Sequence, residues 1–234
     1  MSTTATILGA APQTDATTRR RVGVLALVLG VTAVAAVPAG LLWPEASGDG
    51  GTYVFDDIEP IRNLWWGLLM FLSALQVLNV PAQALAAVLL VRGRGAGWVT
   101  VGGCLMWLGS SLQAAGIAAL ASTYFFPTDP QLDHAASVAV ISQINGDSTH
   151  VLGVMIAGAL LALLGTVLQG IGLLRSHAVP KWVPIALMTI VATFVISGNG
   201  VVGMLTSLPM AAGAIGLGYF AWRLFAHPSM TNET

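Results

Sequence analysis

Long apolar runs alternate with short polar segments along this chain. A helix rises about 1.5 Å per residue, so about 20 apolar residues cross the roughly 30 Å hydrocarbon layer of a membrane. Six runs come close to that length or exceed it. They predict an all-α, polytopic membrane protein with a bundle of six transmembrane helices, over residues 22–43, 63–91, 98–126, 151–174, 182–197 and 201–225.

The connections between these runs predict how the helices pair. Two basic segments, residues 92–97 and 175–181, are so short that the helices on either side must be antiparallel neighbours. We interpret residues 197–200, Ser-Gly-Asn-Gly, as a turn between the last two helices, with a break inside one re-entrant element as the alternative. The six helices are therefore expected to form three antiparallel hairpins.

Local signals add detail to this outline. Pro81 removes a backbone donor and predicts a kink near residues 77–79. Residues 131–144 mix small apolar and polar side chains, which favours a short helix at the outer interface. Asn145 and Gly146 predict a turn, after which Asp147 or Ser148 caps the fourth long helix.

The ionised residues are sorted between two sides of this six-helix arrangement. Eight of the nine basic residues fall on one side and only Arg62 on the other, and basic loops mark the cytoplasm. Eight of the ten acids fall on the outer side. We therefore predict a bacterial plasma (inner) membrane protein with both termini cytoplasmic: residues 1–21 form a disordered tail, 22–226 the membrane domain and 227–234 a second tail.

The first apolar run has a second interpretation. Arg19 to Arg21 precede it, and Ala33, Val34 and Ala35 look like the cleavage site of a secretory signal. The run continues to Trp43, an interface anchor, which favours a retained helix.

Composition changes the picture mainly by exclusion. Only 8% of the residues are charged and 56% are hydrophobic, with a net charge of -1, so no basic surface is available for nucleic acid. The single cysteine excludes an internal disulfide and a cysteine-rich metal site. No Asp, Glu, Lys or Arg falls near the middle of a predicted span, which argues against a proton pump, a cation antiporter or a retinal protein.

The outer end of the fourth helix is the first candidate site. Residues 142–150, Ser-Gln-Ile-Asn-Gly-Asp-Ser-Thr-His, carry an unusual density of donors and acceptors. Asp147 and His150 are candidates for an acid or base, and Asn145 for ligand binding. The alternative is that Asp147 caps the helix and His150 bonds a loop carbonyl. No spacing matches a metal motif, and the four histidines lie at span ends, so we expect no metal and no cofactor.

Neutral polar residues inside the spans form the second candidate site. Gln76, Asn79 and Gln83 recur at intervals of three and four, so they share one helix face, and Gln113 lies in the next span. Amides in lipid seek partners, and interhelical hydrogen bonds of about 0.6 kcal/mol each are one explanation. The other is a pocket that binds a neutral or amphipathic ligand through Gln76, Asn79 and Gln113.

One loop carries a resemblance. Leu173-Leu174-Arg175-Ser176, followed by Val179-Pro180-Lys181-Trp182, resembles the "LLRS…VPRW" loop that joins helices four and five in a set of uncharacterised bacterial six-helix membrane proteins. The resemblance implies the same topology. Because that set has no assigned activity, it implies no catalytic residue.

Three functions follow as hypotheses. The first is a non-enzymatic binding or accessory protein with an outward-facing pocket near Asn145 to His150, holding a small ligand, a lipid or a loop of a partner. The second is a membrane-embedded enzyme for a lipid or isoprenoid, in which Asp147 donates a proton. The third is a small passive or exchange transporter. Partners are expected to be membrane lipids, and a homodimer or a membrane partner subunit stays open because small residues are frequent on the fourth and sixth helices.

Overall fold

The computed structural model of this chain describes residues 16–195 and 200–226, and these residues form helices and connections without a strand. The predicted all-α class is confirmed. Five helices are long: α1 (Ala16–Leu41), α3 (Arg62–Leu90), α4 (Ala96–Phe125), α6 (Ser148–Ser176) and α9 (Gly200–Ala226). Each is long and apolar enough to cross a membrane, which indicates a multi-pass membrane protein.

The fifth predicted span, residues 182–197, differs from the other five. Its residues form two short helices, α7 (Trp182–Met188) and α8 (Ile190–Val195), separated at Thr189. The Thr189 hydroxyl donates to the carbonyl of Ala186 at 2.6 Å, a bond that competes with the regular helix ladder. The predicted turn at residues 197–200 lies outside the described residues except for Gly200, which begins α9 in a left-handed conformation with φ of 60°.

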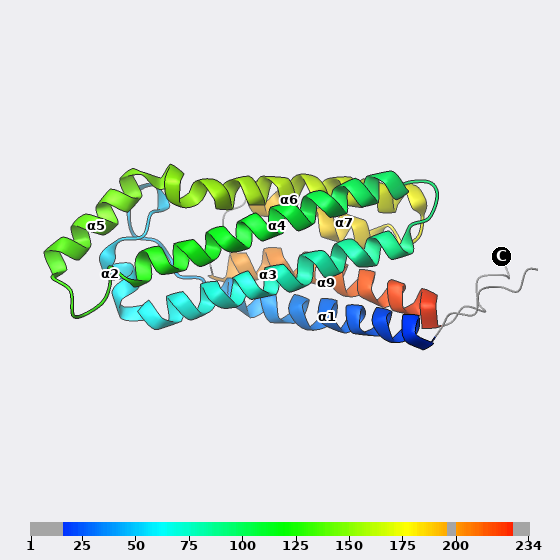
Figure 1. The fold of residues 1–234 in the computed structure, drawn as a ribbon, viewed down its shortest axis with the longest axis horizontal. Helices are drawn as coiled ribbons and strands as arrows, with labels where there is room; N and C mark the ends of the chain where they lie inside the picture. Colours follow the sequence, from blue (N-terminus) through cyan, green and yellow to red (C-terminus); the bar gives the residue numbers. More distant parts are fainter. Residues whose placement is uncertain (1–15, 196–199, 227–234) are drawn as a thin grey trace, which may run out of the picture.

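The helices close into a ring. α3 packs between α1 and α4, α4 packs on α6, and α1 packs on α9, while α7 joins α6 to α9. Figure 1 shows the long helices side by side, with the start of α1, the end of α9 and the α3–α4 and α6–α7 connections at one end. The eight basic residues that were predicted to share one side therefore gather at that end: Arg19, Arg20, Arg21, Arg92, Arg94, Arg175, Lys181 and Arg223.

Two helix boundaries differ from the predicted ones. α1 begins at Ala16 and includes three arginines that we had assigned to a tail ending at residue 21. Arginine is a good helix former whose long side chain reaches polar surroundings, so a helix can continue beyond an apolar layer. Asn145 and Gly146 form the last turn of α5 (His134–Gly146) rather than a separate turn, and the chain changes direction at Asp147.

Glycines set the distance between α4 and α6. Gly102, Gly109 and Gly116 of α4 follow one another at intervals of seven residues, and each faces the backbone of α6. A Cβ atom on Gly109 would lie 2.4 Å from the nitrogen of Ala162 and 2.6 Å from the oxygen of Gly158. The two backbones are thus in direct contact, as small residues permit between membrane helices.

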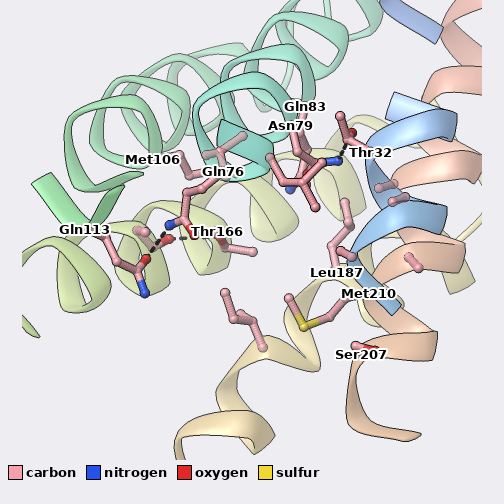
Figure 2. A pocket seen from close by; sticks show the side chains of 18 of the residues that line it. Thr32, Gln76, Asn79, Gln83, Met106, Gln113, Thr166, Leu187, Ser207 and Met210 are labelled. Atoms are coloured by element: carbon pink, nitrogen blue, oxygen red, sulfur yellow. Dashed lines mark hydrogen bonds between the residues drawn. The ribbon is translucent and has the colours of Figure 1, made fainter. Parts of the chain in front are cut away.

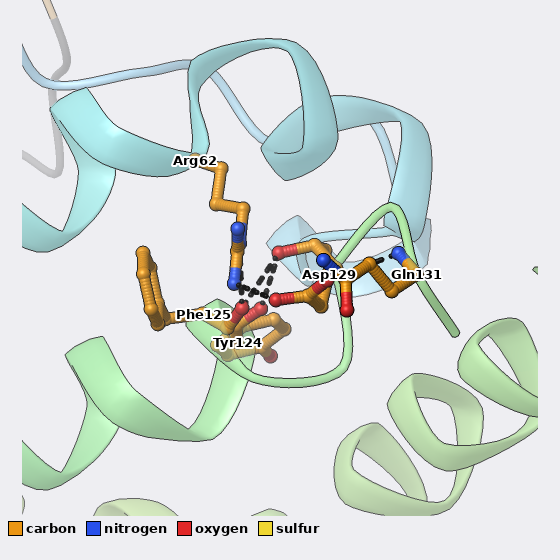
Figure 3. Close-up of polar contacts among 6 residues, drawn as sticks. Arg62, Tyr124, Phe125, Asp129 and Gln131 are labelled. Atoms are coloured by element: carbon orange, nitrogen blue, oxygen red, sulfur yellow. Dashed lines mark hydrogen bonds and ion pairs between the residues drawn. The ribbon is translucent and has the colours of Figure 1, made fainter.

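A cap of short elements covers the other end of the bundle. It consists of η1 (Asp49–Gly51), α2 (Phe55–Ile58), η2 (Glu59–Ile61) and α5, and Figure 1 shows α2 and α5 together at this end. Arg62 joins the start of α3 to the end of α4 and the loop that follows it. Its guanidinium donates to the carboxylate of Asp129 at 2.8 Å and to the carbonyl of Phe125 at 3.0 Å (Figure 3). Its Cζ also lies 4.0 Å from the centre of the Phe125 ring.

Candidate functional site

Asp147 and His150 lie on the surface of the capped end. Nδ1 of His150 is 2.7 Å from Oδ1 of Asp147, and the hydroxyl of Thr149 donates to the same oxygen at 3.1 Å. The bond to His150, followed by the bond from Thr149, lowers the pKa of Asp147, and the bond to the carboxylate raises the pKa of His150. The pair therefore favours an ionised Asp147, which suits a proton donor poorly.

The cap role of Asp147 is only partly as predicted. Asp147 occupies the N-cap position of α6, but its carboxylate accepts no backbone bond there. Its oxygen is engaged by Thr149 and His150 instead, and both Asp147 and His150 are exposed, at 60% and 84% of their side chains. Neither residue lines the two cavities described below, so the predicted outward-facing pocket has no counterpart in them.

Asn145, the third residue predicted for this site, holds the cap together. Its Oδ1 accepts from the hydroxyl of Tyr124 at 2.6 Å, and its Nδ2 donates to the backbone oxygen of Tyr53 at 2.9 Å. The rings of Tyr53 and Tyr124 in turn contact Trp65, which is almost fully buried. Asn145 thus joins α5, α4 and the loop before α2 through one side chain.

Three further polar residues of the cap have structural partners: Asp57, Asp133 and His134. Asp133 is the N-cap of α5 and accepts from the nitrogen of Ala136 at 2.9 Å, while the ring of His134 packs edge-to-face on Phe55. Asp57 is partly buried, which alone would raise its pKa, but hydrogen bonds from Ser47 and Val54 lower it overall. The described part of the chain contains no group of three or more His, Cys, Asp or Glu side chains able to hold a metal ion.

A cavity of about 330 Å³ lies inside the ring of helices. It lies near the middle of α3, α4 and α6, and α1, α7, α8 and α9 complete its wall. The lining residues with polar side chains are Thr32, Gln76, Asn79, Gln83, Gln113, Thr166 and Ser207. No charged side chain or histidine is among the described residues that line it.

The polar groups of this cavity are concentrated on α3. Figure 2 shows Gln76 directed toward Gln113 of α4, and Asn79 directed toward Thr32 of α1. The Gln76 amide donates to Oε1 of Gln113, and the Asn79 amide donates to the Thr32 hydroxyl at 2.7 Å. The wall formed by α7, α8 and α9 is mainly apolar, with Leu187, Ile190, Met210, Ala211 and Ala214.

The structure thus brings together Gln76, Asn79 and Gln113, the three residues predicted for the second site, and leaves Asn145, Asp147 and His150 at the far end of the bundle. Thr32 was not predicted. A threonine in an apolar helix usually bonds its own backbone, as Thr32 does to the carbonyl of Val28 at 2.6 Å, so the sequence gives no sign that its oxygen also accepts from another helix.

A second hollow of about 380 Å³ lies at the capped end beside Arg62, between residues 59–64 and the loop that holds Thr128 and Pro130. The Arg62 guanidinium in its wall is bonded to Asp129 and Phe125. The bond from the backbone of Gln131, together with the charge of Arg62, lowers the pKa of Asp129, so the carboxylate stays ionised to a lower pH than an isolated aspartate does. The hollow lies beside this structural ion pair, and Glu59 and Asn63 also line it.

Comparisons with protein-family models, curated protein sequences and solved structures find no match to this chain. The resemblance at residues 173–182 therefore stays a prediction. The central cavity, with its uncharged amide lining, is the feature on which a functional conclusion rests.

Proposed function

We propose that this protein is an integral membrane protein that binds an uncharged, amphipathic ligand in the cavity between its helices. One observation carries the proposal: a cavity of about 330 Å³ whose α3 wall presents amides while the opposite wall is apolar. Small-molecule sites are mostly apolar concavities of about 300 to 1,000 Å³ with a few placed polar groups. The lining matches that description.

The lining also favours an uncharged ligand. An ionised group taken into an apolar interior loses its hydration, and only an opposite charge or several strong hydrogen bonds compensate. The described lining supplies amides and hydroxyls and no opposite charge. A fatty acid or a phosphate ester is therefore disfavoured, and an alcohol, ester, amide or quinone attached to a hydrocarbon chain is favoured.

A cavity-filling substitution tests this proposal. Ala211 lines the cavity from α9, whereas its neighbour Ala212 is exposed on the outside of the bundle. We expect Ala211→Phe to displace lipid-like molecules that co-purify with the protein, detected by mass spectrometry of the extracted sample, because its ring occupies the ligand volume. Ala212→Phe is the matched control and should retain them.

The outcomes are distinct. Equal retention of the same molecules by both phenylalanine variants, or a native protein that carries no uncharged amphipathic molecule, contradicts binding in this cavity. The unfolding temperature of each variant is measured in parallel, and loss of the ligand counts only if Ala211→Phe unfolds as cooperatively as the control.

We further propose that the chain crosses the bacterial inner membrane six times, with α7 and α8 together as a short fifth span and both termini in the cytoplasm. The basic residues at one end of the bundle support this orientation. Peptide tags at either terminus are expected to be inaccessible to antibodies added to intact spheroplasts, and a tag inserted after Gly48 to be accessible. A terminus that is labelled from outside overturns the proposed topology.

A further inference from the structure

Three amides of α3 reach toward three different helices, and the three contacts differ in quality. The amides of Gln76 and Asn79 make close hydrogen bonds to α4 and α1. The amide of Gln83 donates to Oε1 of Gln169 on α6 across 3.3 Å, which is beyond the usual range for such bonds. The first two contacts are short hydrogen bonds between helices, and the third is a long and therefore loose one.

The loose contact leaves a donor unused. Gln169 is fully buried, and its Nε2 has no hydrogen-bond partner among the described residues. Gln83 uses one of its two N–H groups for Gln169. Buried polar groups are almost always hydrogen-bonded, because an unsatisfied donor keeps the full cost of its lost hydration. Such a group in a native protein requires an explanation.

The position of the pair relates it to the cavity. Gln83 lines the cavity and is itself 6% exposed, and Thr166, one turn before Gln169 on α6, lines it as well. α6 approaches α4 closely at this level, since a Cβ on Gly102 would lie 2.6 Å from the nitrogen of Gln169. Gln169 is not itself among the residues that line the cavity, and its contact with Gln83, which does line it, is what connects the Gln169 amide with the cavity.

We propose that Gln83 and Gln169 recognise the ligand, and that the recognised group is an uncharged oxygen that only accepts hydrogen bonds, such as the carbonyl of an ester or a quinone. The ligand oxygen takes the free N–H of Gln169 and the second N–H of Gln83, while Gln83 keeps its bond to Gln169. This inference rests on the proposed function, and it adds the chemical class of the ligand head and two residues that bind it.

The test uses four probes that share one farnesyl chain. Farnesyl acetate offers an uncharged acceptor, farnesol both donates and accepts, farnesene does neither, and farnesyl diphosphate is charged. We expect the native protein to bind farnesyl acetate about tenfold more tightly than farnesene, since one or two neutral hydrogen bonds are worth about that factor. Farnesol should bind no more tightly than the acetate, and the diphosphate more weakly.

The matching variants separate recognition from stability. In the double variant Gln83→Met/Gln169→Met both amides become apolar groups of similar size, a replacement that is often neutral for stability. We expect it to unfold at the native temperature or higher and to lose the tenfold preference for farnesyl acetate over farnesene. The control, Ser73→Ala, removes a hydrogen bond of 2.9 Å from α3 to the Ala114 carbonyl of α4 at a position that does not line the cavity. It should lower the unfolding temperature while keeping that preference.

Each result decides the question. Equal affinity of the native protein for the acetate and farnesene, or an unchanged preference in the double methionine variant, overturns the assignment of Gln83 and Gln169. A large loss of stability in that variant with the preference kept identifies the pair as structural. If no farnesyl probe binds but Ala211→Phe still displaces a co-purified molecule, this inference fails and the proposed function stands.

Discussion

Replacing Gly158 with alanine is expected to lower the free energy of unfolding by about 2 kcal/mol, within the range found for overpacked cores. The added Cβ would lie 2.4 Å from the nitrogen of Gln113 and 2.6 Å from the oxygen of Gly109, both backbone atoms of α4. No side-chain rotation relieves such a contact. The helices must move apart along the seam where they pack most closely, and titration with a denaturing detergent measures the loss.

The same helix provides the control. Gly153 is also on α6, but a Cβ built there meets no atom within 4 Å. Gly153→Ala should therefore be neutral or stabilise the protein by up to about 1 kcal/mol, because alanine is the better helix former. Similar effects of the two substitutions would contradict the close α4–α6 contact. Gly158→Ala should also weaken retention of the cavity ligand, since Gln113 lies directly against the added methyl group.

The main outline of this fold is readable from the sequence for a simple physical reason. Lipid permits few spanning structures, so a long uncharged run such as residues 151–174 has little alternative to a helix. The segment at 182–197 was the least typical by length, and it is the one that the structure divides at Thr189. A break at a threonine has no distinctive sequence pattern, because the hydroxyls of Thr32 and Thr166 bond their own helix backbone in the same way and those helices continue.

Small residues were only a partial guide to packing. Small residues are frequent on the fourth predicted helix, which is α6, and of these Gly158 and Gly165 do contact α4, whereas a Cβ on Gly153 would meet nothing within 4 Å. On α9, a Cβ on Gly216 would lie 2.5 Å from the Trp182 ring of α7, and one on Gly213 would lie 3.0 Å from Leu187. The presence of small residues shows that another helix can approach closely. Which helix does so depends on how the ring of helices is arranged.

The two candidate sites show the same limit. Gln76, Asn79 and Gln113 could be identified because amides are rare in apolar helices and recur on one face. The polar stretch at residues 142–150 looked equally rich, yet its members separate in space: Asn145 turns into the cap, and Asp147 and His150 face outward. A high frequency of polar residues in a loop between two membrane helices indicates that the loop contacts water or other polar groups. It does not tell whether those residues line a ligand pocket or make structural hydrogen bonds.

Substituting leucine for Asn145 is accordingly expected to destabilise the protein by about 2 kcal/mol. Leucine has a similar shape and none of the polar atoms, so it leaves the hydroxyl of Tyr124 and the backbone oxygen of Tyr53 without this partner. Tyr124 is 5% exposed, and an unsatisfied buried polar group costs about 1 to 3 kcal/mol. Detergent-induced unfolding, followed by the fluorescence of Trp65 and the other tryptophans, measures the change.

Asp147→Asn and His150→Gln provide the comparison, because both side chains are exposed and bond mainly to each other. Each is expected to leave the unfolding temperature unchanged, since exposed pairs contribute little. If either variant destabilised the protein as much as Asn145→Leu, the ion pair rather than the amide would fasten the cap. If all three variants unfolded normally but failed to bind a partner or ligand that the native protein binds, the result would favour the outward-facing site predicted at Asn145 to His150 over the central cavity as the binding site.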